Sequence, residues 1–261
     1  MRPDIDRYWE LKSPIHSWDP RLKILSLLVL AFTISSAQRL PTILGCLLIS
    51  CIVLRLTRIP LSFSLKRLAA VTTFIGPFFL VMPLTIKAQP GDTLYFFSHL
   101  GFLEINARGL VLASRVYLKA VSIVLLVVPM FGTSRFDTSI KALEHLKVPN
   151  SIIQMILFSY RYVFVFLAEL KRMSLAMRVR KFTPSTNFHT LKTYGNFVGT
   201  LLVRSFERAE DVYQAMLARG YTGTLKTRFD YRTRPRDLIK SSLIFITVFG
   251  IIYFDRFFRG F

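Results

Sequence analysis

The sequence predicts an all-α integral membrane protein with about five transmembrane helices and a helical cytoplasmic module that contains two long helices. Two observations lead to this prediction. The chain of 261 residues is 52% hydrophobic, with a mean hydropathy of +0.43, yet its formal net charge is +20. The apolar residues are concentrated in runs and the basic residues lie between those runs, which is typical of a polytopic membrane protein with cationic cytoplasmic segments.

Five apolar runs are long enough to predict membrane-spanning helices. Asp19 is the expected N-cap of the first, with Pro20 at its first helical position. Gly76, Pro77 and Pro83 are expected to kink the third. The predicted spans cover about residues 22–37, 40–56, 68–86, 107–131 and 238–254.

The distribution of charge orients these spans. The segment 87–106, between the third and fourth spans, has one basic residue, Lys87, and the turn sequence Pro90-Gly91-Asp92, as expected of an external loop or hairpin. The other side is basic, since positive residues precede or open the first span and separate the second from the third: Lys12, Arg21, Lys23, Arg55, Arg58, Lys66 and Arg67. The positive-inside rule therefore predicts a cytoplasmic N-terminus.

The segment from Val148 to Leu170 is apolar enough to cross the membrane, but we predict that it does not. Crossing would place the strongly basic stretch 171–236 outside and would put Arg161 at mid-bilayer. We expect a helix that lies along or dips into the cytoplasmic face. A plain sixth span is the alternative.

A short amphipathic helix is expected just before this segment, from about Thr133 to Leu146. Most of the chain between the fourth and last spans is then helical. The predicted organisation is a membrane region of four spans over residues 1–133, a cytoplasmic or interfacial coupling module over residues 134–236, and a last span over residues 237–261.

The stretch from Asn196 to Gly223 is the most informative part of the chain. Its apolar residues recur at helical spacing, and Gly220 is a good C′ residue because it takes the left-handed conformation without a Cβ penalty. Arg219 is therefore expected at the helix tip, with a permanent charge and a forked set of donors. A second helix is expected to end near Arg180, before Pro184. The candidate site residues are these two basic helix ends, Val179-Arg180-Lys181 and Ala218-Arg219-Gly220.

Several kinds of chemistry are missing from the sequence. It contains no G-x-x-x-x-G-K-[ST] phosphate loop, no H-E-x-x-H motif and no Gly-rich dinucleotide fingerprint. Cys46 and Cys51 fall inside an apolar run and predict no disulfide. The four histidines are His16, His99, His145 and His189, and none has a neighbour at metal-ligand spacing. Neither a metal site nor a cofactor is therefore expected. Two basic helix ends in a membrane protein without an ATPase motif indicate two docking points for an external ATPase.

Other classes of protein fit the sequence less well. A nucleic-acid binder is disfavoured, because the basic residues flank the spans rather than forming one patch with an aromatic platform. A membrane-embedded enzyme acting on lipid or isoprenoid substrates stays open as an alternative, although the 15 acidic residues form no D-x-x-D-type cluster. A self-sufficient secondary transporter would predict inverted repeats, which we do not find.

The chain resembles the transmembrane T component of energy-coupling factor transporters, nearest the cobalt-type CbiQ proteins. The resemblance begins with SPIHSWDPRLK at residues 13–23, continues through FSYRYVF at 158–164 and is strongest from Gly195 to Gly220. In that family the paired helix-end motifs read approximately Ala-Arg-Gly and dock into grooves on two ATPase subunits. Residues 218–220 match fully. Residues 179–181 keep only the arginine, and the loss of Gly there implies a different helix end.

The resemblance also implies a role. The chain would be a non-catalytic subunit of the cytoplasmic (inner) membrane that transmits ATPase motion to a separate substrate-binding (S) component. Cobalt is the implied substrate, nickel is close behind, and a vitamin such as biotin is the alternative. Arg115 and Lys119 share a face of the fourth span, where either snorkelling to the external interface or contact with a partner or an internal acid would account for them.

Overall fold

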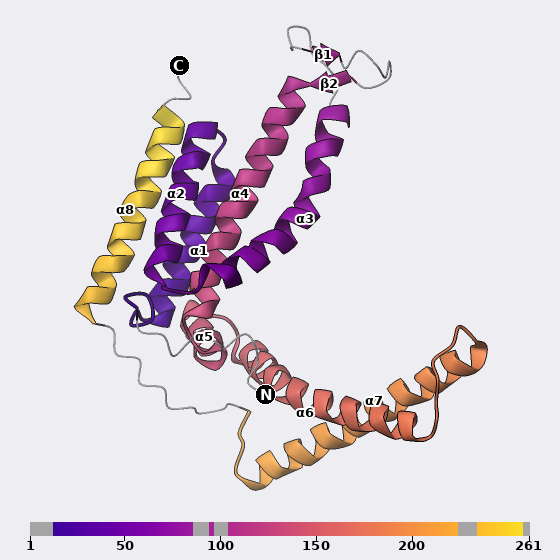
Figure 1. The fold of residues 1–261 in the computed structure, drawn as a ribbon. Coiled ribbons are helices and arrows are strands. Elements are labelled where there is room, and N and C mark those ends of the chain that lie inside the picture. The colour runs from indigo at the N-terminus through magenta and orange to yellow at the C-terminus, as the bar shows by residue number, and fades with distance from the viewer. Residues whose placement is uncertain (1–12, 86–93, 97–103, 224–233, 258–261) are drawn as a thin grey trace. The chain divides into compact units, whose positions relative to one another are not determined.

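The computed structural model describes residues 13–85, 94–96, 104–223 and 234–257 (Figure 1). Contacts divide the chain into two units: unit 1 comprises residues 1–142 and 231–261, and unit 2 comprises residues 143–230. The elements are α1 (Pro20–Ser36), α2 (Leu40–Leu56), α3 (Leu61–Thr85), β1 (Leu94–Phe96), β2 (Glu104–Asn106), α4 (Ala107–Gly132), α5 (Phe136–Ala142), the 3-10 helix η2 (Leu143–Leu146), α6 (Asn150–Val179), α7 (Phe188–Ala218) and α8 (Pro235–Phe257).

Unit 1 is a bundle in which α4 packs on α1, α2 and α3, while α8 packs on α1 and α2 (Figure 1). The short helix α5 lies against α1. Four of the described helices are long and apolar enough to cross a membrane, namely α3, α4, α6 and α8. Helices α1 and α2, which we also predicted as spans, are shorter, with 17 residues each, and are not among these four. The predicted all-α membrane class is confirmed.

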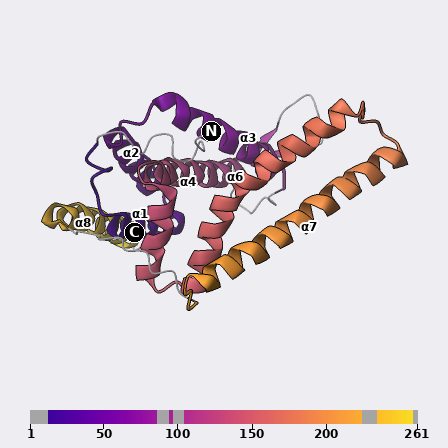
Figure 2. The same cartoon turned by 90° about the horizontal axis from the view of Figure 1, so that it is seen from below.

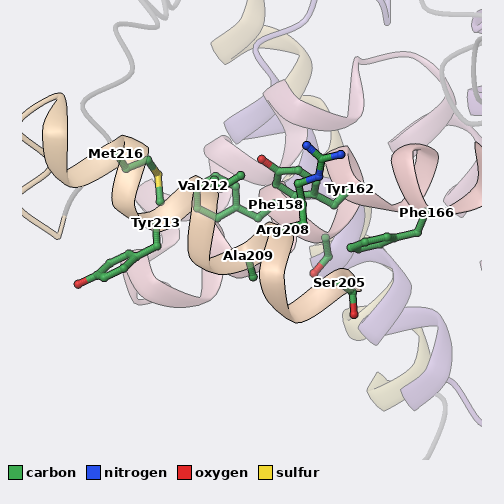
Figure 3. Close-up of a pocket in the computed structure, with 10 residues that line it drawn as sticks. Phe158, Tyr162, Phe166, Ser205, Arg208, Ala209, Val212, Tyr213 and Met216 are labelled. Carbon is green, nitrogen blue, oxygen red and sulfur yellow. The ribbon is translucent and has the colours of Figure 1, made fainter. Parts of the chain in front are cut away.

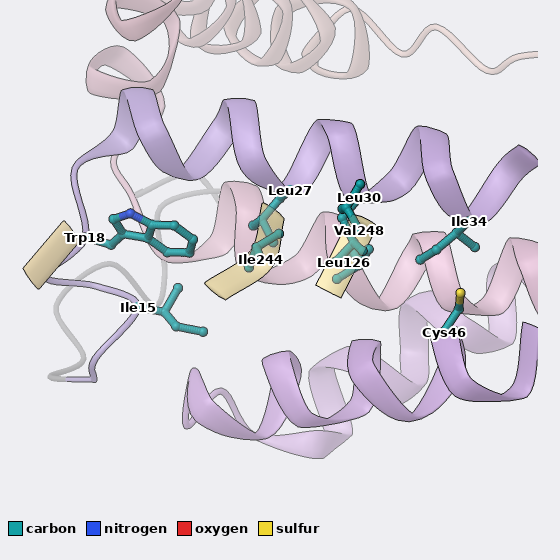
Figure 4. Close-up of a cluster of buried hydrophobic side chains, with 9 residues drawn as sticks. All are labelled: Ile15, Trp18, Leu27, Leu30, Ile34, Cys46, Leu126, Ile244 and Val248. Atoms are coloured by element: carbon teal, nitrogen blue, oxygen red, sulfur yellow. The ribbon is translucent and has the colours of Figure 1, made fainter. Parts of the chain in front are cut away.

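The core of unit 1 is a seam of apolar side chains between α1, α4 and α8, closed by one residue of α2 (Figure 4). The turn that precedes α1 contributes Ile15 and Trp18, which are both buried. The SPIHSWDPRLK segment therefore contributes two side chains to the core. The cluster consists of Ile15, Trp18, Leu27, Leu30, Ile34, Cys46, Leu126, Ile244 and Val248.

Polar contacts fix the beginning of α1. The Asp19 side chain caps the helix by accepting from the Arg21 backbone N–H at 3.0 Å, as predicted. Lys23, which we expect from the sequence to flank the first span, is fully buried. Its ammonium group donates to Thr133 Oγ1 at 2.8 Å and to Ser134 Oγ, so it joins α1 to the turn between α4 and α5.

Helices α3 and α4 approach each other very closely at one point. A Cβ atom on Gly109 of α4 would lie only 2.6 Å from the Cα atom of Pro83 in α3, so glycine is required there. Helix α3 contains Pro77 and Pro83, and its ribbon changes direction along its length, as expected (Figure 1). Helix α3 begins at Leu61, earlier than the predicted start near residue 68, so Lys66 and Arg67 lie inside the helix and not in the preceding loop.

The segment between α3 and α4 contains the only strands among the described residues. Strands β1 and β2 pair antiparallel, with Tyr95 opposite Ile105, which agrees with the hairpin that we expected there. The rest of that segment, including Lys87 and Pro90–Asp92, lies outside the described residues.

Unit 2 consists mainly of α6 and α7, which run antiparallel to each other (Figure 2). Helix α6 is continuous, so the apolar segment that begins near Val148 and the first long basic helix are one element. Very little of this unit is buried. Among the described residues of α6 and α7, only Ile153, Gln154 and Thr190 are classed as buried.

Candidate functional site

The first candidate helix end, which we call tip 1, consists of Val179, Arg180 and Lys181. Helix α6 ends at Val179, and Lys181 takes the left-handed conformation with φ 57°. The Lys181 N–H donates to the carbonyl of Arg178 at 3.0 Å, and the Phe182 N–H donates to the carbonyl of Met177 at 3.1 Å. This pair of bonds is a Schellman motif, which satisfies carbonyl groups that the helix end would otherwise leave unpaired.

The second helix end, tip 2, consists of Ala218, Arg219 and Gly220, and it closes in the same way. Gly220 has φ 80°. Its N–H donates to the carbonyl of Leu217 at 2.9 Å, and the Tyr221 N–H donates to the carbonyl of Met216 at 3.0 Å. The prediction that Gly220 is a left-handed C′ residue is confirmed.

The expectation that tip 1 ends differently because it lacks glycine is wrong. Lys181 occupies the position that Gly220 occupies at tip 2, and Arg180 and Arg219 are the equivalent C-cap residues. An aromatic residue follows at both ends, namely Phe182 and Tyr221. Arg180 and Arg219 are both exposed. At tip 1 an apolar side chain beside the arginine is exposed as well, since Val179 is 76% exposed. The sequence signal for this cap is glycine, so a lysine cap could not be read from the pattern.

The two tips lie at opposite ends of the hairpin. At the base of α6, the Tyr221 hydroxyl donates to Gln154 Oε1 at 2.5 Å, and Gln154 Nε2 donates to the carbonyl of Gly223 at 3.0 Å. The end of α7 is therefore tied to the start of α6. From Gln154 to Arg180, α6 rises by about 40 Å at about 1.5 Å per residue. One small binding site cannot hold both arginines, so the hairpin offers two separate docking points.

Few contacts hold α6 and α7 together between these ends. Glu169 of α6 pairs with Arg204 of α7, and also lies 3.8 Å from Arg172. Near tip 1, the rings of Phe182 and Tyr194 meet edge to face at 5.7 Å. These contacts are local, and α6 and α7 do not form a continuous packed interface.

A groove of about 420 Å³ separates the two helices on the side of tip 2 (Figure 3). Its α6 wall is a row of aromatic rings, with centroids 6.4 Å apart from Phe158 to Tyr162 and 6.4 Å apart from Tyr162 to Phe166. The FSYRYVF segment thus contributes to this wall. Its α7 wall includes Arg208, Val212 and Met216.

Helix α7 also carries a row of exposed apolar side chains along one face, which we call the α7 stripe. The spacing of these residues keeps them on one side of the helix. An apolar surface of this extent is uncommon on a protein surface that faces only water. The stripe consists of Leu191, Val198, Leu202, Phe206, Tyr213 and Leu217, which are 43% to 71% exposed.

Arg115 and Lys119 of α4 differ in their hydrogen bonds. The Lys119 ammonium group donates to the carbonyl of Ser35 at 2.8 Å, in the last turn of α1, where a cation is favoured by the helix dipole. Arg115 keeps its Nε atom buried without a hydrogen-bond partner among the described residues.

Two lysine contacts could not be predicted from the sequence. Lys23 is buried and bonds to Thr133 and Ser134. The Lys240 ammonium group donates to the carbonyl of Pro14 at 2.7 Å.

Metal-binding and redox residues are scattered. Within the part of the chain that the structure describes, no group of three or more His, Cys, Asp or Glu side chains is placed to hold a metal ion. Cys46 is buried and Cys51 is exposed, and both are free thiols. The Nδ1 atom of His16 lies 2.6 Å from Ser13 Oγ in the turn before α1.

Comparisons with known proteins give a consistent result. The family model described as cobalt transport protein, CbiQ, matches residues 11–231. The chain is 24% identical over 254 residues to an uncharacterised protein of Methanocaldococcus jannaschii, covering 96% of this chain and 86% of that protein. It is 27% identical over 247 residues to the energy-coupling factor transporter transmembrane protein EcfT of Bacillus subtilis, covering 90% and 89%. It is also 27% identical over 263 residues to EcfT of Staphylococcus aureus, covering 96% and 95%.

Proposed function

The chain belongs to the cobalt transport protein (CbiQ) family, and from this premise we propose that it serves an ATP-driven importer of cobalt or nickel ions, with tips 1 and 2 as its ATPase-docking residues. Its relatives are transmembrane proteins of energy-coupling factor transporters. The chain is accordingly a T component, a non-catalytic subunit of the transport complex. The lipid-processing enzyme considered as an alternative is set aside on the same grounds.

The observation that carries the proposal is the pair of equivalent helix ends. Each presents one exposed arginine at the C-cap of a long helix, and the two ends are held about 40 Å apart along the hairpin. A guanidinium group at such a position can bind carboxylates or carbonyl groups in a fork-like geometry. We propose that two ATPase subunits bind one tip each, so that their closing and reopening on ATP moves the hairpin.

The α7 stripe supports a membrane partner on the same hairpin. A transporter of this kind requires a separate substrate-binding membrane component, and an exposed apolar helix face is suited to contact with such a protein at the membrane. We propose that the stripe contacts the S component. Displacement of the tips would then reach that component through α6 and α7, because a helix resists compression along its axis.

The charge pattern supports the placement of these parts. We propose that the chain lies in the cytoplasmic membrane, with its N-terminus and both tips in the cytoplasm. Helix α6 then lies along or dips into the cytoplasmic face. Its length and composition also suit a sixth span, which stays the alternative. Impermeant thiol labelling of Ser185→Cys in intact cells, after replacement of Cys46 and Cys51, tests this, because strong labelling means that the loop between α6 and α7 is outside.

Cobalt is proposed as the substrate because of the family's description, with nickel second and a vitamin such as biotin as the alternative. Purification of the complex from the native membrane, followed by identification of the S component and uptake assays with cobalt, nickel and biotin, tests the choice. Saturable uptake of biotin without metal uptake would overturn it.

The docking role is tested by charge reversal at the tips. We expect Arg219→Glu to weaken recovery of the ATPase pair, and Arg180→Glu with Arg219→Glu to abolish it. Removal of one partner of a buried charged pair costs roughly 2–5 kcal/mol, and two linked contacts partly compensate for the loss of one. The matched control is Arg236→Glu at the exposed start of α8. A double variant that is folded in the membrane and still assembles and transports normally would overturn the proposal.

A further inference from the structure

The two tips have the same backbone geometry but differ in the number of cations around them. Between Glu169 and Glu207 the sequence contains no acidic residue, and tip 1 lies within this interval. Exposed cations surround tip 1: Arg178, Arg180, Lys181 and Lys192. Around tip 2 the stretch from Val212 to Gly223 carries one charged residue, Arg219, and the acids Glu207, Glu210 and Asp211 come eight or more residues before it.

The acids of α7 do not neutralise tip 1. The start of α7 lies beside tip 1, as the contact between Phe182 and Tyr194 shows. From Tyr194 to Glu207 the helix rises about 20 Å, which is more than twice the screening length of about 8 Å at physiological ionic strength. The same acids lie about 12–18 Å along the helix from Arg219, so they do not neutralise tip 2 either. Tip 1 is therefore a cluster of four cations, whereas tip 2 presents the single charge of Arg219.

Lys181 is a second cation directly beside the arginine of tip 1. A side chain with a Cβ atom is strained in the left-handed region, where Gly220 is not. Among the described residues, the Lys181 ammonium group has no ion pair or hydrogen bond. Arg58 and Lys147 also take positive φ at helix ends, so the conformation alone does not identify a binding residue. Lys181 differs from them because it directly follows the exposed arginine of a docking tip.

On the basis of the proposed function, we propose that the ATPase surface which receives tip 1 is lined by carboxylates that pair with Lys181 as well as with Arg180. Tip 2 docks through Arg219 and short-range packing. The two contacts then differ in their dependence on salt, because only tip 1 presents a cluster of cations. The tips are not interchangeable, and each fits its own surface on the ATPase pair.

The experiment measures each docking contact separately in the full complex. Single cysteines at Val179→Cys or Ala218→Cys, with Cys46 and Cys51 replaced by alanine, are cross-linked to the ATPase pair in nanodiscs of neutral lipid. We expect tip 1 cross-linking to fall between about 50 mM and about 500 mM salt, and tip 2 cross-linking to change little. Lys181→Gly keeps the left-handed geometry and removes the charge. It should lower apparent affinity at tip 1 about three- to ten-fold at low salt.

The matched control is Lys147→Gly, which makes the same change at an exposed left-handed lysine outside both tips, and should leave both contacts unchanged. Equal salt dependence at the two tips, or undiminished tip 1 cross-linking in Lys181→Gly, would overturn the inference. So would an effect that appears only in nanodiscs of anionic lipid, because the membrane surface would then be the partner. Loss of assembly in the double arginine variant combined with normal Lys181→Gly leaves the proposed function standing and removes only this inference.

Discussion

Units 1 and 2 both contain helices that carry many apolar side chains, but they use these side chains differently. In unit 1, α1 buries Leu27, Leu30 and Ile34 against α4 and α8. In unit 2, α7 leaves side chains such as Leu202 and Phe206 exposed, and its contacts with α6 are few. The described helices of unit 1 thus share a buried core although their outer faces are also apolar, whereas α6 and α7 bury few residues against each other.

The strongest test of this contrast replaces one leucine in each unit. Leu30 is 0% exposed and Leu202 is 69% exposed. We expect Leu30→Ala to lower the free energy of unfolding by roughly 2–5 kcal/mol, since it leaves a cavity. Leu202→Ala should change that free energy by less than about 0.5 kcal/mol but reduce recovery of the transport complex. Thermal unfolding in detergent and co-purification measure the two effects.

Equal destabilisation by the two substitutions would contradict the contrast, because it would mean that the α7 stripe packs within the chain. A conservative Leu202→Met variant controls for the loss of apolar surface. It should keep both stability and assembly.

The sequence predicted much of unit 1 from local signals. Helix α2 has the predicted bounds, and Asp19 and Pro20 begin α1 as expected. The charge pattern could not show that Lys23 is buried, because its partners Thr133 and Ser134 come from the turn between α4 and α5, about 110 residues further along the chain. Counting basic residues treats every lysine beside a span as a flanking charge, whereas burial depends on which hydroxyl groups the fold brings near.

The structure tests the predicted geometry of the two tips, while the docking role of their residues stays a prediction. The glycine signal found the tip 2 cap, and Gly220 has the predicted conformation. The same reasoning gave the wrong backbone at tip 1, because Lys181 takes the strained position that glycine normally fills. The separation of the tips also needed the structure, since it depends on the contact of Tyr221 with Gln154.

A smaller effect is expected at the closest approach within unit 1. In Gly109→Ala, the new Cβ atom would lie 2.6 Å from Pro83 Cα and 3.0 Å from the Met82 carbonyl oxygen, and these backbone atoms cannot rotate away. Helices α3 and α4 must separate, which should cost roughly 1–3 kcal/mol. Thermal unfolding in detergent measures this. Gly45→Ala is the control, because its Cβ atom would meet nothing within 4 Å. An unchanged melting temperature for Gly109→Ala would mean that the helices are not so close.

The smallest expected effect on stability separates a free surface from one that a partner covers closely. Gly199 lies on the α7 stripe, since it is seven residues before Phe206, and a Cβ atom there would meet nothing within 4 Å. Alanine favours a helix over glycine by about 1 kcal/mol, so Gly199→Ala should slow amide hydrogen exchange in α7 of the isolated chain.

Assembly of Gly199→Ala then shows what faces the stripe. Small residues let two membrane-associated helices approach closely, so an added methyl group should weaken recovery of the S component although it strengthens α7 itself. Gly250→Ala in α8 is the matched control, because it too meets nothing within 4 Å and should leave assembly unchanged. A Gly199→Ala variant that slows exchange and assembles normally would show that no partner backbone packs there. The α7 stripe would then be covered by lipid or by flexible side chains, and the proposed S-component contact would have to lie on another face of the hairpin.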